Sequence, residues 1–70
     1  MTLGEKLQLL RRSRGLSQEQ LAAELDVSRQ AISKWETGAA DPSTANLLAL
    51  ARLYGVPAEE LLRNAAHEDT

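Results

Sequence analysis

A run of polar side chains near the middle of the chain carries the groups best suited to chemistry. Between Ser28 and Gly38, a helix that turns 100° per residue would place five polar side chains on one face. They are Arg29, Gln30, Ser33, Lys34 and Thr37. Because arginine and lysine pair with guanine and glutamine pairs with adenine, this face suits the reading of bases in a DNA major groove. An ordinary solvated helix face is the alternative that the residue types leave open.

Catalytic and metal-binding chemistry has little support in the sequence. The chain has no cysteine and a single histidine, His67, near its C-terminus. Glu59 and Glu60 are explained by the first turn of a helix, where the dipole favours acids. No hydrolase motif or glycine-rich phosphate loop occurs. We therefore expect no enzyme activity, no metal and no cofactor.

Helix signals dominate, and no segment alternates like a strand. Thr2 with Glu5 and Ser17 with Gln20 form two capping boxes, which predict the starts of the first two helices. Gly15 ends the first helix between them.

A third helix signal follows within eleven residues of Ser17. Ser28 caps a third helix, at about 29–37, after the three-residue turn 25–27. Asp26 tolerates the left-handed backbone that such a turn needs. Two short helices joined by a tight turn form the layout of a helix-turn-helix, in which the second helix enters the major groove.

Two further helices complete the expected fold. Ser43 is the expected cap of the fourth helix, with Asp41 as a competing start, and Gly55 ends it. Pro57 opens the fifth. The sequence thus predicts an all-α, five-helix domain over residues 1–64 and a flexible tail over 65–70.

The charge distribution and the hydropathy of the chain indicate which kinds of partner it suits. The net charge is −2, but residues 1–38 hold six basic and five acidic side chains (+1), against two and five (−3) in residues 39–70. The basic groups thus gather in the half that holds the helix-turn-helix. No apolar run approaches the roughly 20 residues that span a membrane. The absence of cysteine fits a reducing cytoplasm, where we expect the protein to act.

Three segments make the pattern much more specific. LSQEQLA, VSRQAISKWETG and LLALARLYGV resemble the phage-repressor family of helix-turn-helix proteins, the Cro- and Xre-like group, and the likeness covers residues 3–62. The resemblance implies a repressor-like fold and a sequence-specific DNA-binding transcriptional regulator that acts as a repressor. The implied partner is double-stranded DNA. Because we expect a single copy to bind weakly, we also expect a homodimer on a near-palindromic site.

The resemblance also implies roles for single residues. Contacts to bases fall to the outer face of the third helix, and contacts to the DNA backbone to the ends of the second and third helices. The expected base-contacting residues are Arg29, Gln30, Ser33 and Lys34. The expected backbone-contacting residues are Gln18, Ser28, Thr37 and Gly38. For Gln18, a plain first-turn position in the helix is the alternative that stays open. An ion pair between Arg11 and Glu36 is implied as a structural link, because a half-buried carboxylate needs a cation.

Two features depart from the family's pattern. The turn position that is often Gly in this family is Asp26 here, which predicts mild strain or a side-chain bond at the turn. Asp41 and its alanine neighbours replace the basic residues that this family often places after the third helix, which predicts weak monomer binding. A surface for protein partners is the rival function, because the helical pattern leaves several leucines spare. They are Leu9, Leu48, Leu53 and Leu62.

Overall fold

The computed structural model describes residues 1–66, with side chains for residues 1–63. This part of the chain forms five helices and contains no strand, which confirms the expected all-α repressor-like architecture. The helices are α1 (Leu3–Ser13), α2 (Gln18–Leu25), α3 (Arg29–Thr37), α4 (Thr44–Tyr54) and α5 (Ala58–Ala66).

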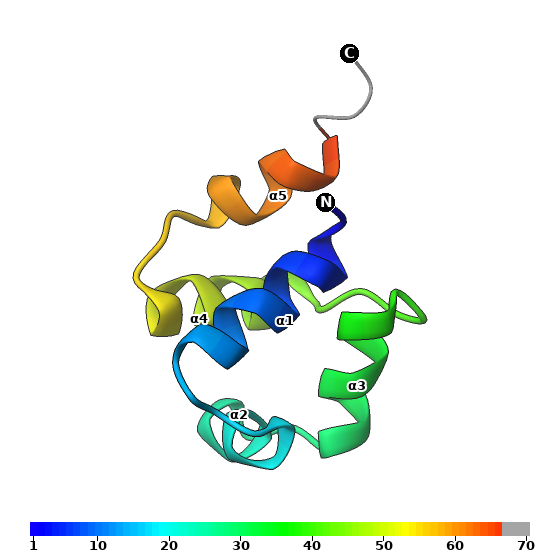
Figure 1. Ribbon diagram of the computed structural model, residues 1–70, viewed down its shortest axis with the longest axis vertical. Coiled ribbons are helices and arrows are strands. Elements are labelled where there is room, and N and C mark those ends of the chain that lie inside the picture. Colours follow the sequence, from blue (N-terminus) through cyan, green and yellow to red (C-terminus); the bar gives the residue numbers. More distant parts are fainter. Residues whose placement is uncertain (67–70) are drawn as a thin grey trace.

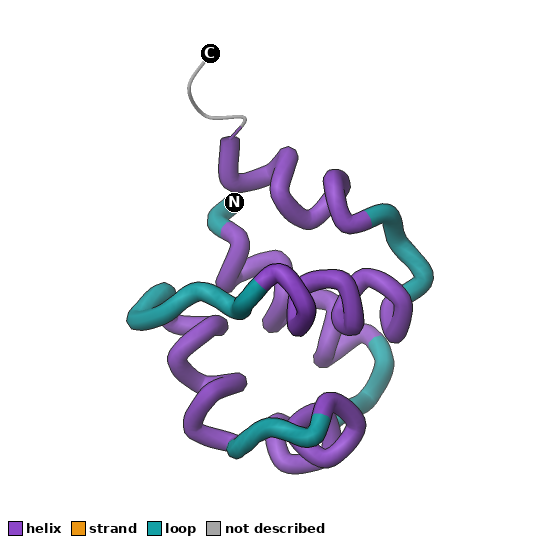
Figure 2. Tube along the Cα trace, turned by 180° about the vertical axis from the view of Figure 1, so that it is seen from behind, coloured by secondary structure: helices purple, strands orange, loops and turns teal. Residues whose placement is uncertain are grey.

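Helix α1 is the central element of the bundle. It packs against both α3 and α5, while α2 packs against α3 and α4. Figure 1 shows α5 at one end of the molecule and the α2–α3 pair at the other, with α1 and α4 between them. The loop between α3 and α4 extends from the side of the bundle, as the view from behind shows (Figure 2).

Both expected capping boxes are present. The Thr2 hydroxyl accepts the Glu5 N–H at 3.1 Å, and the Glu5 carboxylate accepts the Thr2 N–H at 2.9 Å. Ser17 and Gln20 exchange the same two bonds at 3.0 and 2.8 Å. These bonds satisfy backbone donors that a helix start leaves unpaired, so they fix where α1 and α2 begin.

The start of α4 resolves an alternative that the sequence leaves open. The Ser43 hydroxyl accepts the Asn46 N–H at 3.2 Å, so Ser43 is the N-cap and Asp41 lies in the preceding loop. Gly55 ends the helix in the left-handed conformation.

The core is a single cluster drawn from all five helices. Its buried apolar residues are Leu7, Leu21, Ala22, Ile32, Trp35, Leu47, Leu50, Ala51, Tyr54 and Leu61. Three of the four spare leucines are exposed, namely Leu9, Leu48 and Leu62. Leu53 is different, because it is partly buried against the core. The expectation that Leu53 belongs to a spare surface was therefore wrong.

Gly4 allows α1 to lie unusually close to the end of α3. A Cβ atom on Gly4 would stand 2.5 Å from the carbonyl oxygen of Glu36 and 2.6 Å from that of Trp35. Real Cβ atoms do not approach backbone oxygens so closely. The seam between the two helices therefore depends on a residue without a side chain.

The C-terminal boundary stays a prediction. Helix α5 continues to Ala66, two residues past the expected end of the domain at residue 64. The rest of the predicted tail, with His67, lies outside the described residues. Within residues 1–66, no helix is long and apolar enough to cross a membrane. The same residues contain no cluster of His, Cys, Asp or Glu side chains that could hold a metal ion.

Candidate nucleic-acid interface

Helix α3 has two distinct sides. Ile32, Trp35 and Glu36 are buried against the rest of the bundle. Most of the residues expected to contact bases lie on the other side: Arg29, Gln30 and Lys34 are exposed, and Ser33 is half-buried. The structure therefore places these four residues on one short helix whose opposite side is anchored in the core.

The turn before α3 sets the angle between the two helices of the motif. Asp26 ends α2 in the left-handed conformation, with φ 58° and ψ 46°. The Val27 N–H then bonds to the Ala22 carbonyl at 3.0 Å, which closes the turn. Because Ala22 is small and buried, α2 and α3 can cross closely at this point.

The residues at the two ends of α3 have local hydrogen-bond partners. The Ser28 hydroxyl accepts the Ala31 N–H at 3.1 Å and keeps its own proton free to donate. The Thr37 hydroxyl donates to the Lys34 carbonyl at 3.3 Å, so its proton is already in use. Gly38 ends the helix with φ 85°. Ser28 is thus better prepared than Thr37 to donate to a phosphate.

The implied ion pair between α1 and α3 is present in the structure. Arg11 Nε donates to Glu36 Oε2 at 2.7 Å, and Arg11 Nη2 donates to Glu36 Oε1 at 3.2 Å. Both residues are 8% exposed. The hydrogen bond to Glu36 raises the pKa of Arg11 because it stabilises the charged guanidinium. Arg11 Nη1 also donates to the Leu16 carbonyl at 2.7 Å, which ties the α1–α2 connection to the same group.

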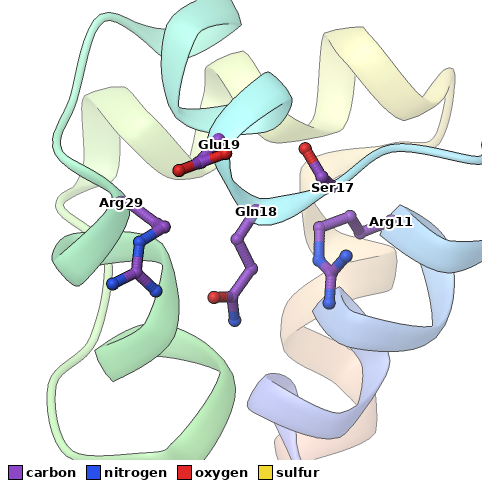
Figure 3. Close-up of a pocket in the computed structure, with 5 residues that line it drawn as sticks. All are labelled: Arg11, Ser17, Gln18, Glu19 and Arg29. Carbon is purple, nitrogen blue, oxygen red and sulfur yellow. The ribbon is translucent and has the colours of Figure 1, made fainter.

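Gln18 joins this network at the start of α2. Its side-chain Nε2 donates to Glu36 Oε1 at 3.1 Å. Gln18 also lines an open surface pocket of about 460 Å³, together with Arg11, Ser17, Glu19 and Arg29. Figure 3 shows the Gln18 side chain extending between those of Arg11 and Arg29. The pocket thus brings the start of α2, a predicted backbone contact, beside the start of α3, a predicted base contact.

A second arginine ties α1 to the end of α4. Arg14 donates to the Tyr54 carbonyl, and its guanidinium carbon lies 5.8 Å from the centre of the Tyr54 ring. Burial, helped by the negative charge of Glu36, raises the pKa of the Tyr54 hydroxyl to about 12. Arg11 and Arg14 therefore both tie α1 to other parts of the bundle.

The connection after α3 carries no cation. Ala39, Ala40 and Asp41 are all exposed, and the Ala40 N–H bonds back to the Lys34 carbonyl at 3.2 Å. The structure thus leaves the acidic side chain of Asp41 free beside the end of α3.

The comparison with known families follows this geometry. A helix-turn-helix family model matches residues 7–61, most of the chain. The chain belongs to the Cro- and Xre-like helix-turn-helix family. Two solved members of similar fold are the P22 c2 repressor and the controller protein C.AhdI of Aeromonas hydrophila. The first has TM-score 0.82 and 31% identity over 87% of this chain and 92% of that one. The second has TM-score 0.76 and 36% identity over 84% and 89%.

Two relatives in the family are longer proteins. The transcriptional activator BcrR of Enterococcus faecalis is 48% identical over 89% of this chain, which spans 30% of BcrR. The transcriptional regulator ImmR of Bacillus subtilis is 36% identical over 89% of this chain, which spans 49% of ImmR. The match therefore covers less than half the length of each of these two regulators.

Sequence reasoning missed two features of this region. It gave Gln18 either a contact to DNA or a plain first-turn position in the helix, whereas the structure also joins Gln18 to Glu36. It also passed over Gly4, which lets α1 approach the carbonyl groups at the end of α3. A glycine inside an otherwise regular helix is the one local signal that could have pointed to that close approach.

Proposed function

We propose that the protein is a sequence-specific DNA-binding transcriptional regulator that inserts α3 into the major groove. The observation that carries the proposal is the division of α3 into a buried side and an outer side rich in Arg, Gln and Lys. Such side chains match the donor and acceptor pattern of base edges. The similar P22 c2 structure is a complex with a synthetic operator, which supports the same use of this fold.

The proposal gives each residue of the interface a role. On the outer face, Arg29, Gln30, Ser33 and Lys34 contact bases. At the helix ends, Gln18, Ser28, Thr37 and Gly38 contact the DNA backbone. The start of α2 suits a phosphate because its N-terminal dipole end favours negative charge. Phosphate contacts fix the register, and base contacts supply the sequence preference.

Two copies act together in this proposal. A homodimer on a near-palindromic site would place its two α3 helices in successive major grooves, about 34 Å apart. The acidic loop at Asp41 supports this requirement, because few cations remain to neutralise phosphates in one copy. We place the dimer in the cytoplasm and expect it to repress by blocking the promoter. A reporter gene under the selected site tests that direction, since BcrR is named as an activator.

The main test is selection of preferred sites from random duplex DNA by the whole chain. The expected result is an enriched near-palindrome with half-sites about 34 Å apart. Changing Arg29→Ala together with Gln30→Ala should abolish enrichment and leave the fold intact. Arg52→Ala is the matched control, because it removes an exposed cation from α4 instead. Absence of any DNA binding by the wild-type protein would overturn the proposal and favour a protein-interaction module.

A further inference from the structure

The bond between Gln18 and Glu36 connects the interior of the motif to its surface. Glu36 is buried on the inner side of α3, while Gln18 is half-buried at the first position of α2. Gln18 Nε2 and Glu36 Oε1 are 3.1 Å apart. A carboxylate that no DNA can reach is therefore in direct contact with a side chain at the proposed interface.

Glu36 is a fixed acceptor rather than a mobile one. The two nitrogens of the Arg11 fork hold its two oxygens at 2.7 and 3.2 Å. Its side chain is only 3% exposed, so water does not compete for these oxygens. Since bidentate arginine–carboxylate pairs impose geometry as well as charge, the position of Oε1 is set by the α1–α3 seam.

The chemistry of the primary amide then decides whether Gln18 offers a hydrogen-bond donor or an acceptor at the surface. Both hydrogens of the amide sit on the one nitrogen, Nε2. One of them is directed at Glu36, which anchors the nitrogen end of the amide. The second hydrogen stays available at the open pocket that Gln18 lines beside Arg29 (Figure 3). A donor is what a phosphate oxygen requires.

We infer that Glu36 is a positioning residue for DNA binding, and that it acts by orienting the Gln18 amide toward a backbone phosphate. This inference rests on the proposed DNA-binding function. Glutamine is among the side chains that lose most rotamer freedom when fixed, so orienting it before binding lowers the cost of the contact.

The first test needs no DNA. Nuclear magnetic resonance relaxation of the side-chain NH₂ groups reports how freely each glutamine amide moves. The Gln18 amide should be ordered, and that of Gln30, exposed on α3, should be mobile and serves as the internal control. Equal mobility of the two amides would overturn the inference.

The second test compares two variants that both lose the ion pair. Arg11→Met with Glu36→Gln retains an acceptor for Gln18, whereas Arg11→Met with Glu36→Leu does not. Replacing a buried ion pair by apolar groups is often tolerated, so both variants should fold. With a random-sequence duplex of about 20 base pairs in about 50 mM salt, phosphate contacts dominate binding. We expect the Leu variant to bind about tenfold more weakly than the Gln variant, a difference of about 1.4 kcal/mol.

Adding Gln18→Ala to the wild-type protein and to the Leu variant distinguishes a positioning role of Glu36 from a purely structural one. That change should weaken the wild-type protein about tenfold and leave the Leu variant unaltered, because its Gln18 is no longer oriented. Equal or tighter binding by the Leu variant would overturn the inference while DNA binding itself stands. If wild-type protein binds no duplex, the proposed function fails instead, and the amide mobilities still decide whether Glu36 orients Gln18. If the Leu variant does not fold, those mobilities decide the question.

Discussion

The two sides of α3 use charge in opposite ways. On the inner side, Glu36 is buried and its oxygens are bonded to Arg11 and Gln18. On the outer side, Arg29 and Lys34 are exposed to solvent. A buried charge without its partner costs several kcal/mol, whereas an exposed charge costs little to remove. Substitutions on the inner side should therefore change folding, and those on the outer side should change binding alone.

The largest expected effect is on the inner side, at Arg11. Arg11→Ala leaves Glu36 buried without its cation and should lower the free energy of unfolding by about 3–5 kcal/mol. Urea unfolding of the variant, at low temperature, measures this loss. Arg12→Ala is the matched control: it removes the neighbouring exposed arginine and should change stability by less than about 0.5 kcal/mol. Similar losses for the two variants would show that the inner side does not depend on its ion pair.

A smaller loss is expected from Gly4→Ala, at the same seam. The added methyl group meets backbone oxygens of Trp35 and Glu36, which cannot rotate away, so α1 must shift. We expect a loss of about 2 kcal/mol, typical of overpacking, and a fall in melting temperature of roughly 10 °C. Gly15→Ala is the control for backbone strain alone, because nothing lies near that position and only the alanine would be strained at its φ of +70°. A stabilised Gly4→Ala protein would mean that α1 does not depend on this close approach.

On the outer side, Lys34→Ala should affect binding without affecting folding. A lost base contact costs about 1–3 kcal/mol, so affinity for the selected site should fall about tenfold or more. The free energy of unfolding should stay within about 0.5 kcal/mol of the wild type. Fluorescence anisotropy of labelled duplex and urea unfolding give the two values. A variant that loses stability instead would place Lys34 on the structural side of the comparison.

The sequence predicts the outer side of α3 better than the inner side. Exposure of Arg29 and Lys34 follows from helical periodicity, and the caps at Thr2 and Ser17 follow from local motifs, because neighbours in sequence decide both. The close approach at Gly4 joins residues more than thirty positions apart in the chain, so a glycine inside a helix can mark it but cannot say which residues approach.

The inner network shows the same limit. The Arg11–Glu36 pair came from family resemblance rather than from spacing. The bond from Gln18 came from neither, because it depends on how three helices meet.

The smallest expected effect lies at Asp26, which joins the two helices of the motif. Its φ of 58° is tolerated by Asp but costs Gly nothing, so Asp26→Gly removes strain at the turn. The more flexible unfolded chain of the variant offsets part of this gain. We expect a net stabilisation of about 0.5 kcal/mol. It should appear as a higher midpoint of urea unfolding, with an unchanged dependence of the free energy of unfolding on urea concentration. Asp26→Ala keeps the strain while removing the same charge. If the Ala variant gains as much as the Gly variant, the charge of Asp26 rather than its backbone conformation limits the turn.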